Sequence, residues 1–327
     1  MRRFLRQALF CMVFTLHAGA MDLDTTGLQS ALASIARSFD GRVGACIQNG
    51  KGSACILAEN RFSLQSVVKL AVSVAVLDSV DRGRRRLDEA VVVRKEDLSL
   101  FVQPLAELVG PSGYQTTIGD LVRRAIIDSD SAATDFLIAL LGGPSAVQAI
   151  LKTKGISGIR VDRDERHLQT EIVGLTWRPE YVDAVTLDRA VSAVPRARRQ
   201  AAYAKYQVDF RDTATPRGMA LFLFRLAKGD LLLESSTEYV LRAMKECKTF
   251  PDRLKAGIGP GWQIAHKTGT SGSWEGLTAA TNDVGILTAP DGSQISIAVF
   301  VADSRKSSAE RAAIFTRISG AVIANYR

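Results

Sequence analysis

The chain has 327 residues, of which 46% are hydrophobic and 23% are charged. This composition excludes a disordered or low-complexity protein, and the length suffices for one large domain or two interlocked ones. The net charge of +8 is compatible with nucleic-acid binding, but the sequence holds no nucleic-acid motif. We therefore expect the arginine clusters to be solvated surface and predict no nucleic-acid partner.

The first twenty residues have the pattern of a secretory signal peptide. Arg2, Arg3 and Arg6 precede the short apolar run at residues 8–16, and small residues follow at positions 18–20. We expect cleavage after residue 20, which lowers the net charge to +5. The apolar run is too short to span a bilayer, so the sequence predicts a secreted, periplasmic (bacterial) protein with no membrane anchor.

A helix and a hairpin are the first elements predicted after residue 20. Thr25 or Thr26 is the expected N-cap of a helix that extends to about residue 36. Strands at residues 42–48 and 53–58 follow, and the turn at residues 49–52 joins them. The two strands therefore form a β-hairpin.

Three cysteines remain after signal-peptide removal. A two-residue loop in the hairpin places Cys46 opposite Cys55, where they form either a disulfide or two buried thiols. An oxidising compartment permits the disulfide. Cys247 has no partner and is expected to be buried.

The central stretch is Phe62–Lys69, followed by an apolar run at residues 70–77. A helix with so few polar positions is predicted to be buried on nearly all sides and to end near Gly83. Ser66 and Lys69 lie three residues apart, in the first turn and on one face of this helix. A desolvated lysine can take a proton from serine, although Ser-x-x-Lys alone is common by chance.

The remaining elements follow in order along the chain. We predict a connector at residues 87–95 and helices at 116–127 and 132–141. The region at 145–247 is predicted to be largely helical, with irregular segments near 158–180 and 207–216. Strands are predicted at 262–267, 277–287 and 294–301, with a closing helix at 309–326. Residues 21–61 and 251–327 then form a discontinuous α/β domain, and residues 62–250 form a helical domain.

Three further motifs accompany Ser66-x-x-Lys69. They are Ser129-Asp130-Ser131 at a break between two helices, Lys267-Thr268-Gly269 at the end of a strand, and Glu165 within residues 162–169. In this order and spacing they resemble the signature of the class A serine β-lactamases. The resemblance covers nearly the whole mature chain. It implies an α/β (α+β) fold, with an antiparallel five-stranded sheet, flanking helices, an all-helical domain and the active site between them.

The resemblance also implies a reaction, the hydrolysis of the β-lactam amide of penicillins and cephalosporins through a serine acyl-enzyme. This activity gives antibiotic resistance, and it needs no metal or organic cofactor. Ser66 is the implied nucleophile, Ser129 the proton shuttle to the leaving nitrogen, and Glu165 the group that activates the hydrolytic water. Either Lys69 or Glu165 takes the serine proton during acylation.

The family pattern also assigns substrate-binding roles. Lys267, Thr268, Gly269 and Thr270 are expected to hold the substrate, with the ammonium group of Lys267 facing its carboxylate. The backbone N–H groups of Ser66 and Thr270 form the implied oxyanion hole.

Three positions depart from the family pattern. Ser131 and Gln169 each replace a common asparagine near the substrate, and Asp135 replaces an asparagine that braces the glutamate loop. Gln65 together with Asp135 resembles an extended-spectrum subgroup. Ser131 can still hydrogen-bond substrate amides.

Two further residues have alternative interpretations. The family's usual arginine after Lys-Thr-Gly is missing, and Arg253 is either the substitute cation for the substrate carboxylate or a surface arginine. Phe101 is either the aromatic wall of the pocket or a core residue.

The largest departure is the length of the glutamate loop. In the family an arginine and an aspartate close this loop with a salt bridge, and Arg163 and Asp212 match them. They are separated by far more residues than usual, so we infer an insertion at about 172–205 with helices around 181–193 and 198–206.

Other enzyme classes fit less well. His167 and His266 lack metal-ligand spacing, and no Gly-x-Ser-x-Gly elbow occurs. The closest alternatives are a peptidoglycan D-Ala-D-Ala carboxypeptidase or transpeptidase and a non-hydrolysing periplasmic β-lactam sensor. We expect a monomer whose partners are small-molecule β-lactam substrates.

Overall fold

The structure is a computed structural model that describes residues 22–327, so the predicted signal peptide lies outside the described residues. Its helices are α1 (Thr25–Arg37), α2 (Val68–Asp81), α3 (Ile118–Ile127), α4 (Ser131–Leu140), α5 (Pro144–Thr153), α6 (Glu165–Ile172), α7 (Ala184–Ser192), α8 (Arg196–Gln207), α9 (Pro216–Ala227), α10 (Glu234–Lys245) and α11 (Ser308–Ala324). Its strands are β1 (Arg42–Gln48), β2 (Ser53–Ile56), β3 (Phe62–Ser63), β4 (Ala90–Val93), β5 (Tyr114–Thr117), β6 (Thr213–Ala214), β7 (Gln263–Thr270), β8 (Ser273–Trp274), β9 (Leu277–Thr278), β10 (Thr281–Thr288) and β11 (Gln294–Ala302).

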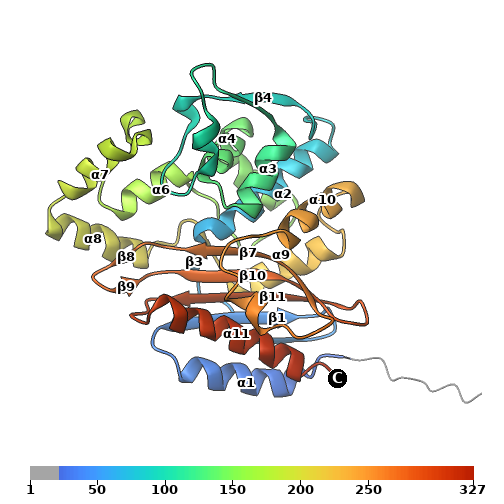
Figure 1. Cartoon of the computed structure of the whole chain (residues 1–327). Coiled ribbons are helices and arrows are strands. Elements are labelled where there is room, and N and C mark those ends of the chain that lie inside the picture. Colours follow the sequence, from blue (N-terminus) through green and yellow to red (C-terminus); the bar gives the residue numbers. More distant parts are fainter. Residues whose placement is uncertain (1–21) are drawn as a thin grey trace, which may run out of the picture.

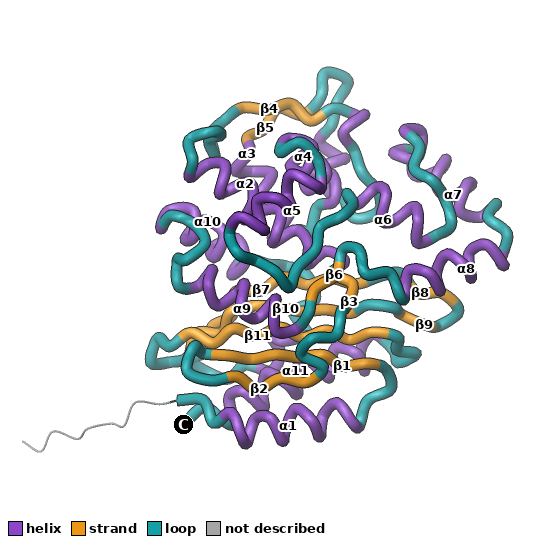
Figure 2. The backbone as a smooth tube through the Cα atoms, turned by 180° about the vertical axis from the view of Figure 1, so that it is seen from behind, coloured by secondary structure: helices purple, strands orange, loops and turns teal. Residues whose placement is uncertain are grey.

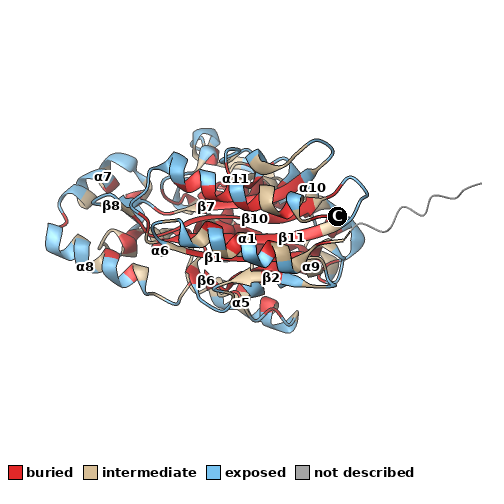
Figure 3. Cartoon of the chain, turned by 90° about the horizontal axis from the view of Figure 1, so that it is seen from below, coloured by how far each residue is buried: buried red, intermediate tan, exposed pale blue. Residues whose placement is uncertain are grey.

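A five-stranded sheet in the order β2-β1-β11-β10-β7 forms the base of the molecule. Every neighbouring pair in it is antiparallel, as the resemblance implied. Helices α1 and α11 cover its lower face in Figure 1, and Figure 3 views them from below. Helix α9 packs on the opposite face, between the sheet and the helical layer.

The pleat of β1 sends successive side chains to these two faces. Ala45 and Ile47 join the core that α1 and α11 complete, whereas Cys46 joins the core shared with α2 and α9. This alternation is the period of two expected for a strand buried on both faces. The sheet therefore separates two hydrophobic cores.

Helix α2 is the centre of the helical layer. Every residue from Val68 to Ser79 is buried, which confirms the prediction from the apolar run. Gly83 adopts φ = +68° just after the helix, a conformation that glycine reaches without steric cost. Helices α3, α4, α5 and α10 surround α2.

Several element boundaries differ from the prediction. The residue that caps α1 is Asp24, whose carboxylate accepts a hydrogen bond from Gly27 N at 2.9 Å. The predicted connector at 87–95 contains a strand, since β4 pairs with β5. The strand predicted at 277–287 is two strands, because β9 pairs with β8 and β10 pairs with β7. The second hairpin strand ends at Ile56, since Leu57 has φ = +44°.

The cysteines pair within the first hairpin. Cys46 lies opposite Cys55 in the register of β1 and β2, as predicted, and a disulfide joins them. The alternative of two buried thiols is therefore wrong for this pair. Cys247 is free and buried.

The two helices predicted around 181–193 and 198–206 are present as α7 and α8, which lie beside α6 at one end of the molecule (Figure 2). Within residues 22–327 no single helix has the length and hydropathy of a bilayer crossing, and only the bent pair α4 and α5, counted together, meets both criteria.

Candidate active site

The nucleophile candidate lies on a short 3-10 turn at Gln65–Val67 that leads directly into α2. Ser66 therefore precedes the α-helix instead of occupying its first turn, which corrects the prediction. Lys69 still lies close, with its Nζ donating a hydrogen bond to Ser66 Oγ at 2.9 Å. A buried amine and a partly buried hydroxyl thus meet at the start of the central helix.

Lys69 connects three candidate site residues, namely Ser66, Ser131 and Glu165. Its Nζ lies 2.9 Å from Glu165 Oε1 and donates to Ser131 Oγ at 3.2 Å. Lys69 and Glu165 are only 1% and 3% exposed, so their charges are nearly free of solvent screening. Both candidate bases for Ser66 therefore share one proton network.

Lys267 reaches the same region from the end of β7. Its Nζ donates to Ser129 Oγ at 3.0 Å, across the boundary between the sheet and the helical layer. Ser129 has φ = +60° at the break between α3 and α4, where Asp130 caps α4 through Ala133 N. Burial lowers the pKa of Lys267 to about 8.

Gly269 allows β7 to approach the nucleophile turn. A Cβ at this position would lie 2.7 Å from Leu64 O and 3.1 Å from Ser66 N. On the other side, Asn282 Nδ2 of β10 donates to Ser63 O at 2.8 Å and to Leu64 O at 2.9 Å. The sheet therefore fixes the backbone that carries Ser66.

Arg253 is not a surface residue, so that alternative is wrong. Its side chain is buried, with Nη2 donating to Thr270 Oγ1 at 2.6 Å and Nη1 donating to Asn282 O at 2.8 Å. Burial lowers the pKa of the guanidinium to about 10, which leaves it charged at neutral pH. A cation thus lies directly behind the hydroxyl of Thr270.

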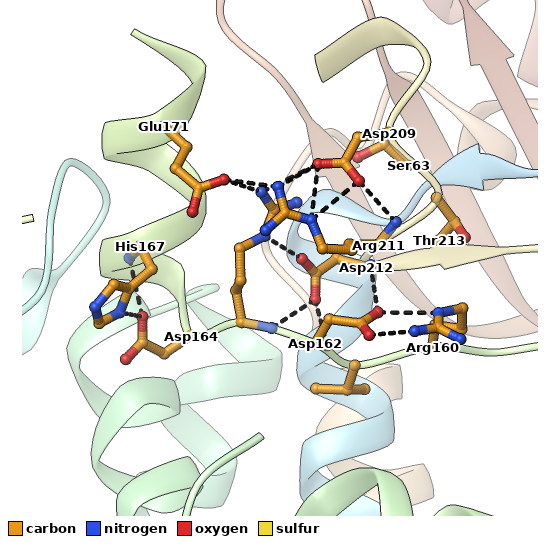
Figure 4. Close-up of polar contacts among 12 residues, drawn as sticks. Ser63, Arg160, Asp162, Asp164, His167, Glu171, Asp209, Arg211, Asp212 and Thr213 are labelled. Carbon is orange, nitrogen blue, oxygen red and sulfur yellow. Dashed lines mark hydrogen bonds and ion pairs between the residues drawn. The ribbon is translucent and has the colours of Figure 1, made fainter. Parts of the chain in front are cut away.

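The glutamate loop is closed by the predicted salt bridge. Arg163 Nε lies 2.7 Å from Asp212 Oδ2, and Asp212 Oδ1 accepts hydrogen bonds from the backbone N–H groups of Asp162 and Arg163. Arg163 also pairs with Glu171 and Asp209. Figure 4 shows Arg211 joined to the same two carboxylates. These residues lie outside the catalytic cavity and stabilise its wall.

Asp135 braces the other end of the loop, in the place where the resemblance predicted a brace. Its Oδ1 accepts a hydrogen bond from Glu165 N at 2.7 Å, and its Oδ2 accepts one from Ser99 Oγ at 2.6 Å. Burial, together with the negative charges of Asp164 and Glu165, raises the pKa of Asp135 to about 7.

A cavity of about 300 Å³ opens above these groups. Six of the candidate residues line it, namely Phe101, Ser66, Ser131, Glu165, Gln169 and Thr270. Phe101 is 57% exposed, so the alternative that placed it in the core is wrong. Within residues 22–327 no group of three or more His, Cys, Asp or Glu side chains could hold a metal ion.

Three residues shape the site although no contact was assigned to any of them from the sequence. No role was assigned to Asn282 from the sequence, although an asparagine inside an apolar strand is a usable signal. Gln65 adopts φ = +47° and its amide contacts Gln169, and Tyr206 of α8 contacts Gln65 in turn. No local pattern indicates these last contacts.

Comparison with known proteins agrees with this geometry. A model of the β-lactamase enzyme family matches residues 27–326. β-Lactamase VEB-1 of Pseudomonas aeruginosa is 27% identical over 288 residues, which cover 87% of this chain and 85% of that protein. The extended-spectrum β-lactamase PER-1 of the same organism is 30% identical over 260 residues, which cover 79% and 73%.

Solved structures give a similar result. The crystal structure of a β-lactamase from Chitinophaga pinensis superimposes with a TM-score of 0.74 at 28% identity, covering 90% of this chain and 97% of that one. A structure of an ancestral class A β-lactamase has a TM-score of 0.72 at 28% identity and covers 91% of this chain and 99% of that one.

Proposed function

The chain belongs to the β-lactamase enzyme family, and on that premise we propose that it hydrolyses penicillins and cephalosporins through an acyl-enzyme on Ser66. The observation that carries this proposal is the position of Lys69 Nζ, which lies 2.9 Å from both Ser66 Oγ and Glu165 Oε1. One buried amine thus connects the nucleophile to a carboxylate, as a class A serine β-lactamase requires.

In the acylation step, Ser66 Oγ attacks the lactam carbonyl carbon and gives its proton to the Lys69–Glu165 pair. The backbone N–H groups of Ser66 and Thr270 stabilise the oxyanion. The carbon–nitrogen bond then breaks, and Ser129 transfers a proton to the leaving nitrogen. The contact of Ser129 Oγ with Lys267 Nζ at 3.0 Å supports this role, because an ammonium beside the hydroxyl can replace that proton. The proton held by the Lys69–Glu165 pair then passes to Lys267, so Glu165 is a carboxylate again before deacylation.

In the deacylation step, Glu165 takes a proton from a water molecule, whose oxygen attacks the ester carbon on Ser66. The ester bond breaks, and the proton returns to Ser66 Oγ. Gln169 Nε2 donates to Glu165 Oε2 at 3.2 Å, and Asp135 holds the backbone N–H of Glu165. These contacts orient the carboxylate toward the cavity.

The substrate carboxylate is assigned to the end of β7. Lys267, Thr268, Gly269 and Thr270 lie along one strand, and the buried charge of Arg253 contacts the Thr270 hydroxyl. The buried guanidinium of Arg253 favours the binding of an anionic group, such as the substrate carboxylate, near Thr270. Phe101, Ser131 and Gln169 are left to contact the acylamido side of the substrate.

Three broader features form part of the same proposal. The protein is exported to the periplasm as a monomer without a membrane anchor. Residues 21–61 and 251–327 form one discontinuous domain, and residues 62–250 form the second. The catalytic cavity lies where the helical layer meets β7 of the sheet, which is the arrangement that this division implies.

A chromogenic cephalosporin tests the proposal directly. Sustained turnover by the purified protein supports hydrolysis, whereas a single stoichiometric burst supports a transpeptidase or a sensor. The Glu165→Ala variant should still acylate and should accumulate a covalent adduct that intact-mass spectrometry detects. Free enzyme at steady state in this variant would contradict the role of Glu165. Ser66→Ala, which removes the nucleophile, is the control that forms no adduct.

A further inference from the structure

The inserted helix α8 carries a side chain that reaches the catalytic turn. Tyr206 lies in its last turn and is buried, and its hydroxyl contacts two residues that precede Ser66. We propose that Tyr206 is a positioning residue for deacylation, which holds Gln65 and, through Gln65 and Gln169, the carboxylate of Glu165. This inference rests on the proposed function of Glu165.

The contacts form a continuous chain of hydrogen bonds. Gln65 Nε2 donates to the Tyr206 hydroxyl, which also pairs with Ser63 Oγ at 2.8 Å. Gln65 Oε1 accepts a hydrogen bond from Gln169 Nε2 at 3.1 Å. The same amide group of Gln169 donates to Glu165 Oε2 at 3.2 Å. Both ends of the Gln65 amide and the amide group of Gln169 are therefore occupied.

The backbone of Gln65 makes this support necessary. Gln65 has φ = +47°, which non-glycine residues adopt only when surrounding contacts hold them there. Its side chain is buried, so water cannot replace a lost partner at low cost. Without the Tyr206 hydroxyl, the Gln65 amide is free to rotate away from Gln169.

Helix α8 is held firmly enough to position a side chain. The Tyr203 hydroxyl accepts a hydrogen bond from Ala279 N at 2.9 Å and contacts Leu277 O at 2.8 Å, next to the end of β7. Tyr203 and Tyr206 also share a hydrophobic cluster with Leu168 of α6. The insertion is thus fixed to both the sheet and the glutamate helix.

The effect should fall on deacylation and spare acylation. The chain from Tyr206 ends at Glu165 Oε2, whereas Lys69 faces the other oxygen, Oε1. The hydrogen bonds of the Tyr206 hydroxyl within residues 22–327 do not reach Ser66 or Lys69. Loss of the hydroxyl therefore alters the group that activates water while it leaves the Ser66–Lys69 pair in place.

The test is the Tyr206→Phe variant with a chromogenic cephalosporin. Quenched samples analysed by mass spectrometry give separate rates for formation and decay of the Ser66 adduct. We expect decay to slow about tenfold, and formation to change less than about twofold. The matched control is Tyr181→Phe, which removes a hydroxyl of the same insertion that forms no hydrogen bond within the described residues. Its decay rate should equal that of the parent protein.

A second variant separates positioning from loss of structure. If Tyr206 acts through Gln169, the double variant Tyr206→Phe/Gln169→Met should decay no more slowly than Gln169→Met alone. The inference would be overturned if the double variant decayed more slowly than Gln169→Met by the factor seen for Tyr206→Phe alone. It would also be overturned if Tyr206→Phe left the decay rate unchanged. If Glu165→Ala accumulates adduct while Tyr206→Phe does not, the positioning role fails and the proposed function stands. If neither Glu165→Ala nor Tyr206→Phe accumulates adduct, the proposed role of Glu165 is wrong, and the inference that rests on it is wrong as well.

Discussion

Asp135 offers a test that links the glutamate loop to pH. Its carboxylate is fully enclosed and accepts hydrogen bonds from Glu165 N, Arg166 Nε and Ser99 Oγ, while the charges of Asp164 and Glu165 oppose its ionisation. Replacement by asparagine keeps the shape and one oxygen acceptor but removes the titration. The Asp135→Asn variant therefore isolates the free energy of burying this one carboxyl.

The raised pKa of Asp135 sets the direction in which the free energy of unfolding changes with pH. Between the ordinary pKa of 3.8 and a pKa of about 7, folded Asp135 holds a proton that the unfolded chain has released. The free energy of unfolding therefore falls as pH rises through this window. The difference corresponds to about 4 kcal/mol at most, because each pH unit is worth about 1.4 kcal/mol. The Asp135→Asn variant does not lose this free energy of unfolding, because asparagine does not titrate.

Urea unfolding at several pH values measures the effect. We expect the stability of Asp135→Asn relative to the parent protein to increase by about 2–4 kcal/mol between pH 5 and pH 8. Asp188→Asn, the same substitution at an exposed aspartate on α7, is the matched control. Parallel pH–stability curves for Asp135→Asn and the parent would refute the reasoning.

Three other substitutions have definite expected results. The double variant Cys46→Ala/Cys55→Ala opens a loop with a sequence separation of 9. It should lose about 2–3 kcal/mol of stability in denaturant unfolding but keep its kcat/KM, and equal stability would contradict a constraining disulfide. Gly269→Ala places a Cβ 2.7 Å from Leu64 O, so it should lower kcat/KM at least about tenfold and cost about 1–3 kcal/mol in thermal unfolding. Arg253→Met should raise the KM for a penicillin about tenfold, and Arg253→Lys should recover part of this loss. An unchanged KM in Arg253→Met would exclude a role in carboxylate binding.

Local chemistry made much of the site predictable. The apolar run after Ser66 predicted a buried helix, because a helix without a polar face has no side to present to water. The spacing of Ser66 and Lys69 predicted that they lie close together, and the 3-10 turn that leads into α2 also brings them within 2.9 Å. The turn between Cys46 and Cys55 predicted their register, because the loop length of a hairpin sets the pairing of its strands. These features depend on residues close together in the chain.

Tertiary structure alone decided the features that join distant segments. The burial of Arg253 follows from its position beneath Thr270 and Asn282, and no local pattern distinguishes it from a surface arginine. The strand at Ala90–Val93 exists because residues 114–117 supply its hydrogen-bond partners. Tyr206 reaches Gln65 across a sequence separation of 141 residues, and only the packing of α8 on α6 brings them together. The sequence thus determined which groups could do chemistry, and the packing decided which of them touch, because hydrogen bonds and ion pairs act only over a few ångströms.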